Sequence, residues 1–420
     1  MDNFLTHTFS ITNHPICELK EVNRVQYVMG LGEFMCYMSK KDSRAKLVFE
    51  VWARCITSQF SSLWWRCSND YSYIHGAISL KRDGLRFFSM RRTFFFDCFY
   101  LASLLDPKLL MYAHSFLHEH IKGIFSRQTL KDIYLNWGKS TIKKIPEQLL
   151  KHRHNNSIFQ NSPLKRILVV ATMTAGKSTL INALTGYHIS KVETTACTDK
   201  LCFIYNKPAP DGLMVKAMNG GFLYSYKIDP SIISEFQEAA LHFKSLLSDN
   251  RVCLIDTPGV NYSRTAKHQE ITHRAIKGNN YDTILFVANS NYFESNDELD
   301  LLKYTLRHSK KPIIFLLNKV DTFRVKNDSI EKMVREFENI LSQLKCNGRV
   351  IPLSAEAAYY SKQNPNILDS DELSEYEFYK QKFENSFYDL PSYYEGKHRN
   401  SFIDRTGITL IEQTIKQIIK

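Results

Sequence analysis

The sequence lacks an apolar run long enough to cross a membrane. The longest run, residues 93–105 (TFFFDCFYLASLL), is shorter than the roughly 20 residues that a spanning helix needs, and it carries Asp97 in its middle. We expect a buried helix there, with a membrane-dipping segment as the alternative. The first residues (MDNFLTHTFSITNH) show no basic start followed by an apolar stretch, so no secretory signal is expected. The sequence therefore predicts a cytoplasmic protein that could lie against the inner face of the membrane.

Paired cysteine motifs are also missing. The nine cysteines, at positions 17, 36, 55, 67, 98, 197, 202, 253 and 346, show no CxxC spacing. Cys202 and Cys253 lie in apolar, strand-like runs. Buried and reduced thiols are therefore expected, in preference to a metal site or a disulfide framework.

Length and charge indicate two modules. A chain of 420 residues is well above the usual size of one domain. The formal charge of +12 is unevenly distributed, because most of the excess of Lys and Arg over Asp and Glu falls within the first 160 residues. Such an excess suits anionic lipid or RNA, although a solvated basic surface is the commoner explanation.

The first module is predicted to be helical. From residue 21 to about residue 150, apolar residues recur at spacings of three and four, as in Leu109, Ala113 and Phe116. Residues 151–163 (KHRHNNSIFQNSP) are polar and end in proline, which indicates a boundary. We therefore expect a basic, all-α helical module over 1–155 and a second domain over 163–420.

The second domain is predicted to be α/β. Near-continuous apolar runs indicate strands at 166–171, 252–255, 283–288, 312–317 and 350–353. Continuous hydrophobicity implies burial on both faces, and hence a mostly parallel sheet covered by helices. Helices are expected at 177–185, 296–307, 329–344 and 407–419, with insertions at about 207–250 and 358–405. The first insertion is predicted to contain a hairpin that turns at Asn219-Gly220-Gly221, followed by a helix near 231–247.

The first chemical motif connects the strand at 166–171 to the helix at 177–185. It reads ATMTAGKST from Ala171 to Thr179, and it begins with alanine where the usual consensus has glycine. Small residues let backbone N–H groups converge on phosphates, a lysine reaches the β and γ oxygens, and a serine hydroxyl can bind Mg²⁺. The predicted phosphate-binding residues are Thr174, Ala175, Gly176, Lys177, Ser178 and Thr179.

A second motif, Asp256-Thr257-Pro258-Gly259, follows the strand at 252–255. A carboxylate at the end of a strand can hold a water bound to Mg²⁺, and the glycine lets the backbone approach a γ-phosphate. A threonine between the two motifs should reach Mg²⁺ with its hydroxyl and the γ-phosphate with its N–H. Thr198 is favoured over Thr195, so the predicted Mg²⁺ ligands are Ser178, Thr198 and, through water, Asp256.

A third motif, Asn318-Lys319-Val320-Asp321, follows the strand at 312–317. Asp321 can accept both hydrogen bonds that guanine offers from N1–H and its amino group, and adenine lacks this arrangement. Asn318 would tie this loop to the phosphate loop, while the stem of Lys319 covers the base. After the next strand, a backbone N–H of Ser354-Ala355 can meet the guanine oxygen.

Taken in order, these elements resemble the GTPase superfamily. The wording AGKSTLINALTG, ACT, IDTPG, LNKVD, LSA and TGITLIEQTI looks like the bacterial branch of the dynamin-like family, over about residues 164–420. The resemblance implies a P-loop GTPase fold, GTP as substrate, Mg²⁺ dependence and hydrolysis promoted by association of two G domains in a homodimer or higher oligomer. It also implies catalytic roles for Lys177, Thr198 and Thr174, the last through the γ-phosphate or a monovalent cation.

Two positions depart from related GTPases. Met173 stands where many dynamin-like proteins have glutamine, and Val260 follows Gly259 where small GTPases have glutamine. Neither side chain can orient a water molecule. Slow turnover that depends on a partner or on a second copy of the chain is the resulting hypothesis.

Three functions are compatible with these features. The first is a dynamin-like GTPase that acts at an anionic membrane or in a self-assembly, as the basic helices and the family wording favour. The second is a regulatory GTPase that binds RNA or ribosomal particles, which the basic N-terminal charge permits but favours less. The third is a nucleotide-gated interaction module with little hydrolysis, as Ala171, Met173 and Val260 suggest.

Overall fold

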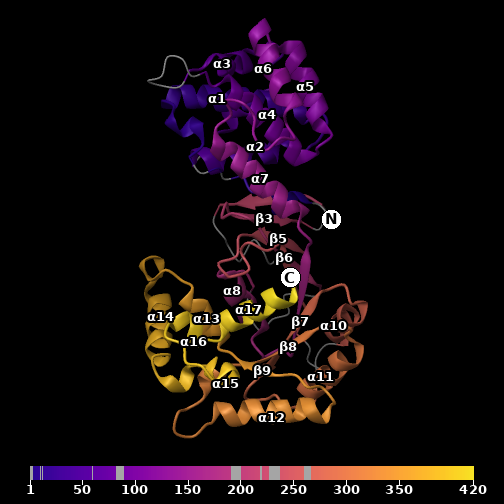
Figure 1. Ribbon diagram of the computed structural model, residues 1–420, viewed down its shortest axis with the longest axis vertical. Helices are drawn as coiled ribbons and strands as arrows, with labels where there is room; N and C mark the ends of the chain where they lie inside the picture. Colours follow the sequence, from indigo (N-terminus) through magenta and orange to yellow (C-terminus); the bar gives the residue numbers. More distant parts are fainter. Residues whose placement is uncertain are drawn as a thin grey trace. The chain divides into compact units, whose positions relative to one another are not determined.

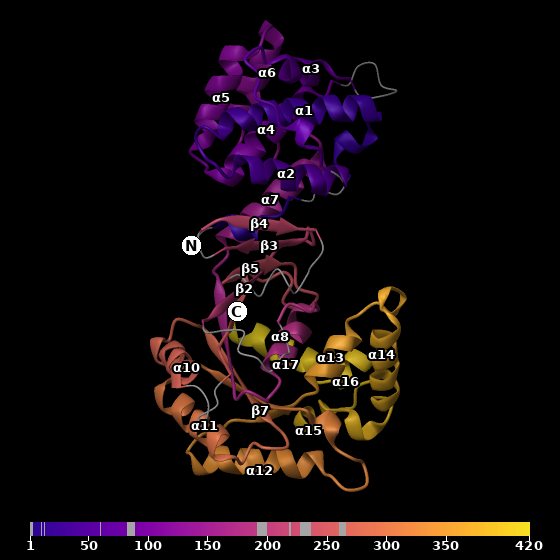
Figure 2. The ribbon, with the colours of Figure 1, turned by 180° about the vertical axis from the view of Figure 1, so that it is seen from behind.

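The described residues up to 161 are mainly helical, and strands alternate with helices after them, as Figure 1 and, from behind, Figure 2 show. The computed structural model describes residues 3–9, 11, 13–58, 60–81, 89–190, 200–217, 220–226, 237–259 and 266–420. The chain forms two units: a helical unit of residues 1–161 with 208–211 and 222–224, and a sheet unit of 162–207, 212–221 and 225–420. Up to residue 161 the described elements are all helices, apart from an isolated bridge between Lys81 and Ser89, as the prediction of an all-α module expects.

The helical unit is built around one buried helix. Its helices are α1 (Glu21–Met38), α2 (Ala45–Thr57), α3 (Ser72–Ser79), α4 (Arg91–Leu105), α5 (Leu109–His120), α6 (Ile124–Leu135) and α7 (Glu147–Asn161). Helix α4 contacts α1, α2, α3, α5 and α6. It is the longest apolar run of the sequence, and its aromatic side chains Phe94, Phe95, Phe96 and Phe99 are fully buried. The predicted buried helix is therefore confirmed.

Asp97 has partners inside this apolar helix. Its carboxylate accepts a hydrogen bond from the Tyr27 hydroxyl at 2.7 Å and lies 3.1 Å from Nε2 of His14. Burial, followed by the adjacent charge of Asp97, raises the pKa of Tyr27 well above its ordinary value. Within the described part of the chain, no helix is both long enough and apolar enough to cross a bilayer.

Two features of the helical unit were not anticipated. The polar stretch at 151–163 contains the boundary between the units, after residue 161, but its first part is helical: α7 runs to Asn161 and buries Asn156, whose side-chain amide donates to the backbone carbonyl of Thr8 and to the Tyr100 hydroxyl. The expectation of reduced thiols is wrong for Cys36 and Cys67, which form a disulfide. Folding brings these two cysteines together from 31 residues apart, and no local spacing reveals such a pairing.

A mixed sheet with helices on both faces belongs to the sheet unit, except for residues 222–224 of its strand β4, which are grouped with the helical unit. The strands are β1 (Lys165–Ala171), β2 (Cys202–Asn206), β3 (Leu213–Lys216), β4 (Phe222–Ser225), β5 (Glu238–Leu241), β6 (Val252–Asp256), β7 (Thr283–Asn289), β8 (Ile313–Asn318) and β9 (Val350–Pro352). Among the described residues their order is β4-β3-β5-β2-β6-β1-β7-β8-β9. The neighbours from β6 to β9 pair in parallel, whereas β2 with β6 and β3 with β5 are antiparallel. The predicted mostly parallel α/β sheet is confirmed.

Two sets of helices cover this sheet. The helices after β1 are α8 (Lys177–Thr185), α10 (Ala266–Gly278), α11 (Asn296–His308), α12 (Ile330–Gln343), α13 (Ala355–Ser361), α14 (Ser370–Lys382), α15 (Ser392–Glu395), α16 (Phe402–Arg405) and α17 (Ile408–Ile418). Apolar residues of α8, α13 and α17 share one buried cluster with one face of β1 and β7. On the other face, Phe315 of β8 contacts Phe286 of β7 and Phe337 of α12. Burial on both faces explains the continuous apolar strands.

The first insertion is partly different from the prediction. The expected hairpin is present as β3 and β4, with Gly220 at φ +84° in its turn; residues 218–219 lie outside the described part. The helix expected near 231–247 is wrong for residues 238–241, which form β5. That strand pairs in parallel with β2 and antiparallel with β3, so cross-strand hydrogen bonds override the helical tendency of its EAAL sequence.

Candidate functional site

The predicted motifs meet at the carboxyl edge of the parallel strands. In the sheet register Val169 of β1 lies opposite Asp256 of β6, and Asn289 of β7 lies opposite Asn318 of β8. Because neighbouring parallel strands end at the same edge, the loops that follow them are brought together. This edge is the place where open α/β sheets bind their ligands.

Asn318 joins three loops at this edge. Its Nδ2 donates a hydrogen bond to the Ala175 carbonyl at 2.8 Å, and its Oδ1 accepts one from the Ala355 amide at 2.9 Å. Gly176 has φ +84°, and a Cβ atom built there would collide with Nδ2 of Asn318. The loop therefore needs glycine both for its backbone conformation and for this close approach. The predicted tie between the asparagine and the phosphate loop is present.

Lys177 begins α8 and forms an ion pair with Asp256. Both residues are buried, at 8% and 4% exposed, and the Ser190 hydroxyl lies 3.4 Å from the other carboxylate oxygen of Asp256. Each charge therefore has its compensating partner within the protein. An incoming phosphate would compete with Asp256 for the amine, at the positive N-terminal end of a helix.

Two residues behind the phosphate loop were not singled out from the sequence. Glu298 of α11 is buried; its carboxylate accepts a hydrogen bond from the Thr172 hydroxyl at 2.6 Å and one from the Asn289 amide at 3.2 Å. The side chain of Asn289 donates to the Thr174 carbonyl at 3.1 Å. Desolvation raises the pKa of Glu298 to about 7, although both hydrogen bonds favour the ionised form. A polar residue at the carboxyl end of β7 was the signal that could have revealed Asn289.

The third motif lies on an acidic surface that includes Asp321, Glu356 and Glu375. Lys319 adopts a left-handed conformation at φ +67°, and Asp321 follows in a short 3-10 helix over Val320–Thr322. Glu356 is exposed overall, but its carboxyl is partly desolvated by neighbouring protein atoms, and this raises its pKa. Repulsion from Asp321 and Glu375 raises the pKa of Glu356 further. Burial, followed by the charge of Asp321, also raises the pKa of Tyr379. This acidic surface is suited to accept hydrogen bonds from N–H groups and to repel anions.

The remaining predicted residues are placed as follows. Ser178 and Thr179 lie in the first turn of α8, Ser354 caps α13 by accepting a hydrogen bond from the Ala357 amide, and Thr174 is exposed in the loop. A Cβ atom on Gly259 would lie 3.0 Å from the Met173 backbone, so the second motif abuts the phosphate loop. Thr195, Thr198 and Val260 lie outside the described residues.

Hard oxygen donors of the kind that Mg²⁺ prefers are present beside the lysine. The hydroxyl of Ser178 comes from the residue after Lys177, and the carboxylate of Asp256 contacts the same lysine. The donor set therefore fits a magnesium ion bound partly through water.

Comparison with known proteins finds similarity to the dynamin family and to GTPases. Residues 167–320 match the profile of the dynamin family. A bacterial dynamin-like protein of Nostoc punctiforme is 25% identical over 251 residues, covering 54% of this chain and 34% of the relative. The GTPase Era of Haemophilus influenzae is 29% identical over 104 residues, covering 24% of this chain and 32% of the relative. The chain thus spans about a third of the length of these curated relatives.

Solved structures show more distant likeness. Era in complex with MgGDPNP and nucleotides of 16S ribosomal RNA is 20% identical, with a TM-score of 0.30, covering 47% of this chain and 52% of that one. A structure described as an oligomerised bacterial dynamin pair, providing a mechanism for the long range sensing and tethering of membranes, is 14% identical with a TM-score of 0.36, covering 98% and 62%.

Proposed function

We propose that residues 167–320, which belong to the dynamin family, give this chain the ability to bind GTP and hydrolyse it to GDP and phosphate. One observation carries the proposal: Asn318 bonds the phosphate loop and the loop at Ala355 at the same time. These two bonds support the proposal that Lys177, for phosphate, and Asp321, for guanine, serve one site.

The proposed binding step replaces one ion pair by another. Lys177 moves its amine from Asp256 to the β and γ oxygens of the nucleotide, assisted by the backbone N–H groups from Thr174 to Thr179. The hydroxyls of Ser178 and Thr198 and, through water, the freed carboxylate of Asp256 would hold Mg²⁺, which would supply charge neutralisation at the phosphates. Gly259, next to Met173, lets its backbone approach the γ-phosphate.

Guanine is proposed to be selected by Asp321. Its carboxylate accepts hydrogen bonds from the base, with the stem of Lys319 against the ring, and adenine would leave the carboxylate unpaired. The Ala355 amide already donates to Asn318, so the guanine oxygen is met at the Ser354-Ala355 turn only if that bond is shared or shifted.

Hydrolysis is proposed to be slow in the isolated chain. Water attacks the γ-phosphorus and the bond to the β-phosphate oxygen breaks, while Thr174, Thr198 and Lys177 stabilise the charge that develops. Met173 cannot orient the water, so a second G domain, with or without a monovalent cation, completes the site. Single-turnover rates should rise with protein concentration, and a fast rate that is independent of concentration would exclude this part of the proposal.

Calorimetry tests the nucleotide preference. The full chain should bind GTP at least about 100-fold more tightly than ATP, and Asp321→Ala should remove most of this ratio. Asp300→Ala, which changes a half-exposed acid on α11, is the matched control and should leave the ratio intact. Equal affinities for the two nucleotides, or an unchanged ratio in Asp321→Ala, would overturn the assignment.

The partner is proposed to be an anionic membrane at the cytoplasmic face, with RNA as the less favoured alternative. The net positive charge of the chain supports either ligand. The two ligands differ in the side chains that they need at the contact surface: apolar groups for a bilayer and stacking aromatic rings for single-stranded RNA.

A further inference from the structure

The pair of helices α5 and α6 carries an unusual number of exposed apolar side chains. Ile124 is 82% exposed and Phe125 is 79% exposed, and both begin α6 directly after the turn at Gly123, whose φ is +92°. Leu135, Met111 and Tyr112 on the same two helices are also exposed. Single exposed apolar residues are ordinary, but a cluster on one helical hairpin indicates a surface that is covered in use.

These side chains are not required by the core of the helical unit. Helix α6 already has a buried stripe, formed by Ser126, Leu130 and Ile133. Ile124 and Leu135 are separated by 11 residues, which is three turns of a helix, so they lie on one further face, with Lys131 between them. Helix α6 therefore exposes an apolar side chain at each end of the face that lies opposite its buried stripe.

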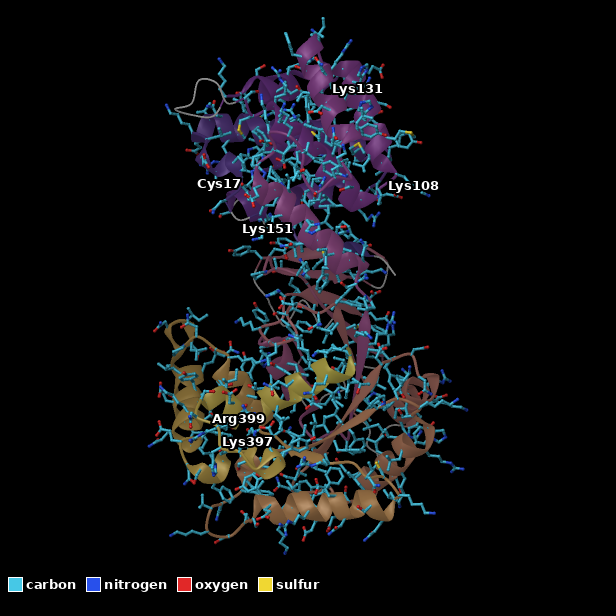
Figure 3. The ribbon with its side chains drawn as sticks, in the orientation of Figure 1. Cys17, Lys108, Lys131, Lys151, Lys397 and Arg399 are labelled. Atoms are coloured by element: carbon cyan, nitrogen blue, oxygen red, sulfur yellow. A yellow bond between two sulfur atoms is a disulfide. The ribbon has the colours of Figure 1, made fainter. Side chains whose placement is uncertain are left out.

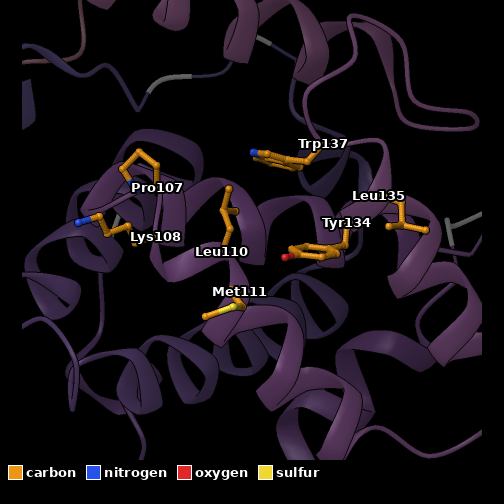
Figure 4. Close-up of a pocket in the computed structure, with 7 residues that line it drawn as sticks. All are labelled: Pro107, Lys108, Leu110, Met111, Tyr134, Leu135 and Trp137. Carbon is orange, nitrogen blue, oxygen red and sulfur yellow. The ribbon is translucent and has the colours of Figure 1, made fainter.

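An open apolar pocket lies where this second face meets α5. Its volume is about 570 Å³, and its lining comprises Pro107, Lys108, Leu110, Met111, Tyr134, Leu135 and Trp137. Figure 4 shows Leu110, Tyr134 and Trp137 directed towards the same space. The pocket extends the apolar surface of α6 at the end opposite to Ile124.

Positive charge surrounds this apolar surface. Lys122, Arg127 and Lys131 are exposed on the turn and on α6, and Figure 3 shows Lys108 and Lys131 at the outer surface of the helical unit. The nearby acids are Glu119, which is exposed, and Asp132, whose carboxylate is paired with Arg92 at 2.9 Å. The unpaired charge beside Ile124 and Phe125 is thus predominantly positive.

We propose that this surface, comprising Ile124, Phe125, Lys131, Leu135 and the adjoining pocket, docks on an anionic lipid bilayer. Helix α6 lies in the plane of the interface, the apolar side chains enter below the head groups, and the lysines and Arg127 contact lipid phosphates. Ile124 and Leu135 favour a bilayer over RNA, because aliphatic side chains offer no ring for a base to stack on, whereas the ring of Phe125 beside them suits either ligand. The inference extends the membrane part of the proposed function and does not depend on GTP hydrolysis.

Vesicle flotation with the full chain tests the docking surface. The chain should bind vesicles of phosphatidylcholine with phosphatidylserine and should bind phosphatidylcholine alone at least about tenfold more weakly. The double variant Ile124→Ser, Phe125→Ser should lower binding to the anionic vesicles by at least about tenfold. Val22→Ser is the matched control, because Val22 is equally exposed at 79% on α1, and it should bind as the unchanged chain does.

Two further measurements separate charge from insertion. Lys131→Glu should weaken binding to the anionic vesicles and reduce the dependence of binding on salt. In Phe125→Trp, the fluorescence added by the new tryptophan should be quenched by lipids brominated on their acyl chains. Circular dichroism and basal GTP turnover should be unchanged in all these variants, which distinguishes a failure of docking from a failure of the nucleotide site. Absence of binding to anionic vesicles, full binding by the double variant, or binding of the surface to RNA or to a protein in place of lipid would overturn the proposal.

Discussion

Each unit contains a buried aspartate, and the two aspartates differ in what holds them. Asp97 in the helical unit is fully buried between the Tyr27 hydroxyl and His14, all three on packed elements. Asp256 in the sheet unit lies at the end of β6 and is paired with Lys177, which begins a helix directly after a loop. The first cluster is closed, whereas the second stands at the edge where the motif loops meet.

This difference distinguishes a carboxylate that stabilises the fold from one that is available to a ligand. A buried carboxylate whose partners cannot move contributes to the fold, since losing any partner leaves an uncompensated group. A carboxylate whose partner is the residue expected to bind phosphate can exchange that partner for a ligand. The following changes test the distinction, from the largest expected effect to the smallest.

Asp97→Ala should destabilise the helical unit by about 3–5 kcal/mol, because it leaves Tyr27 and His14 without their acceptor in the core. All four tryptophans, Trp52, Trp64, Trp65 and Trp137, belong to this unit, so urea unfolding followed by tryptophan fluorescence reports it. Asp97→Asn keeps an acceptor and should cost less. A loss below about 1 kcal/mol in the alanine variant would show that Asp97 is not structural.

Lys177→Ala should reduce GTP turnover by about 10²–10³-fold, equivalent to roughly 3–4 kcal/mol, because the developing phosphate charge loses its amine. The unfolding curve from tryptophan fluorescence, which reports the helical unit, should not move, because Lys177 lies in the sheet unit. Lys303→Ala, which changes a half-exposed lysine on α11, is the control. Turnover within about threefold of the unchanged chain would remove Lys177 from the proposed site.

Glu298→Gln should flatten the pH dependence of stability of the sheet unit. Because burial raises the pKa of Glu298 from its ordinary 4.5 to about 7, the folded state binds a proton that the unfolded state has released over this range. That contribution is fully present below about pH 4.5 and is lost as the pH rises through about 7, a difference of up to about 3 kcal/mol. Hydrogen exchange of β1 and β7 amides between pH 5 and pH 8 should show the slope in the parent chain and a smaller one in the variant. Equal slopes would contradict the assignment.

Asn318→Ala should weaken GTP binding by about 5–30-fold, or roughly 1–2 kcal/mol, because two hydrogen bonds that join the loops are lost. Calorimetry at fixed pH gives the affinity. Asn327→Ala, in the exposed loop that follows, is a control that should leave it unchanged. An effect on unfolding without an effect on affinity would make Asn318 a structural residue only.

Short-range information explains which parts of the fold were predictable. The strands β1, β6, β7, β8 and β9 have near-continuous apolar interiors, and burial on both faces requires that pattern. The motif residues follow these strands directly, so the order of strands and motifs was enough to place Lys177, Asp256 and Asn318 at one edge. The strand β5 was missed because its residues would suit a helix, and only pairing with β2 and β3 makes it a strand.

By itself, the sequence determined the parallel sheet, the loops at its carboxyl edge and the dynamin-like order of motifs, because each depends on continuous apolar runs and on the residues that directly follow them. The tertiary structure alone decided that Glu298 supports Thr172, that Cys36 pairs with Cys67 and that Asp97 finds Tyr27 and His14. It also decided that Ile124 and Phe125 stay exposed while Ser126, Leu130 and Ile133 of the same helix are buried. These features join residues that are far apart in the chain, or depend on which side of α6 packs into the core. No local sequence pattern carries that information.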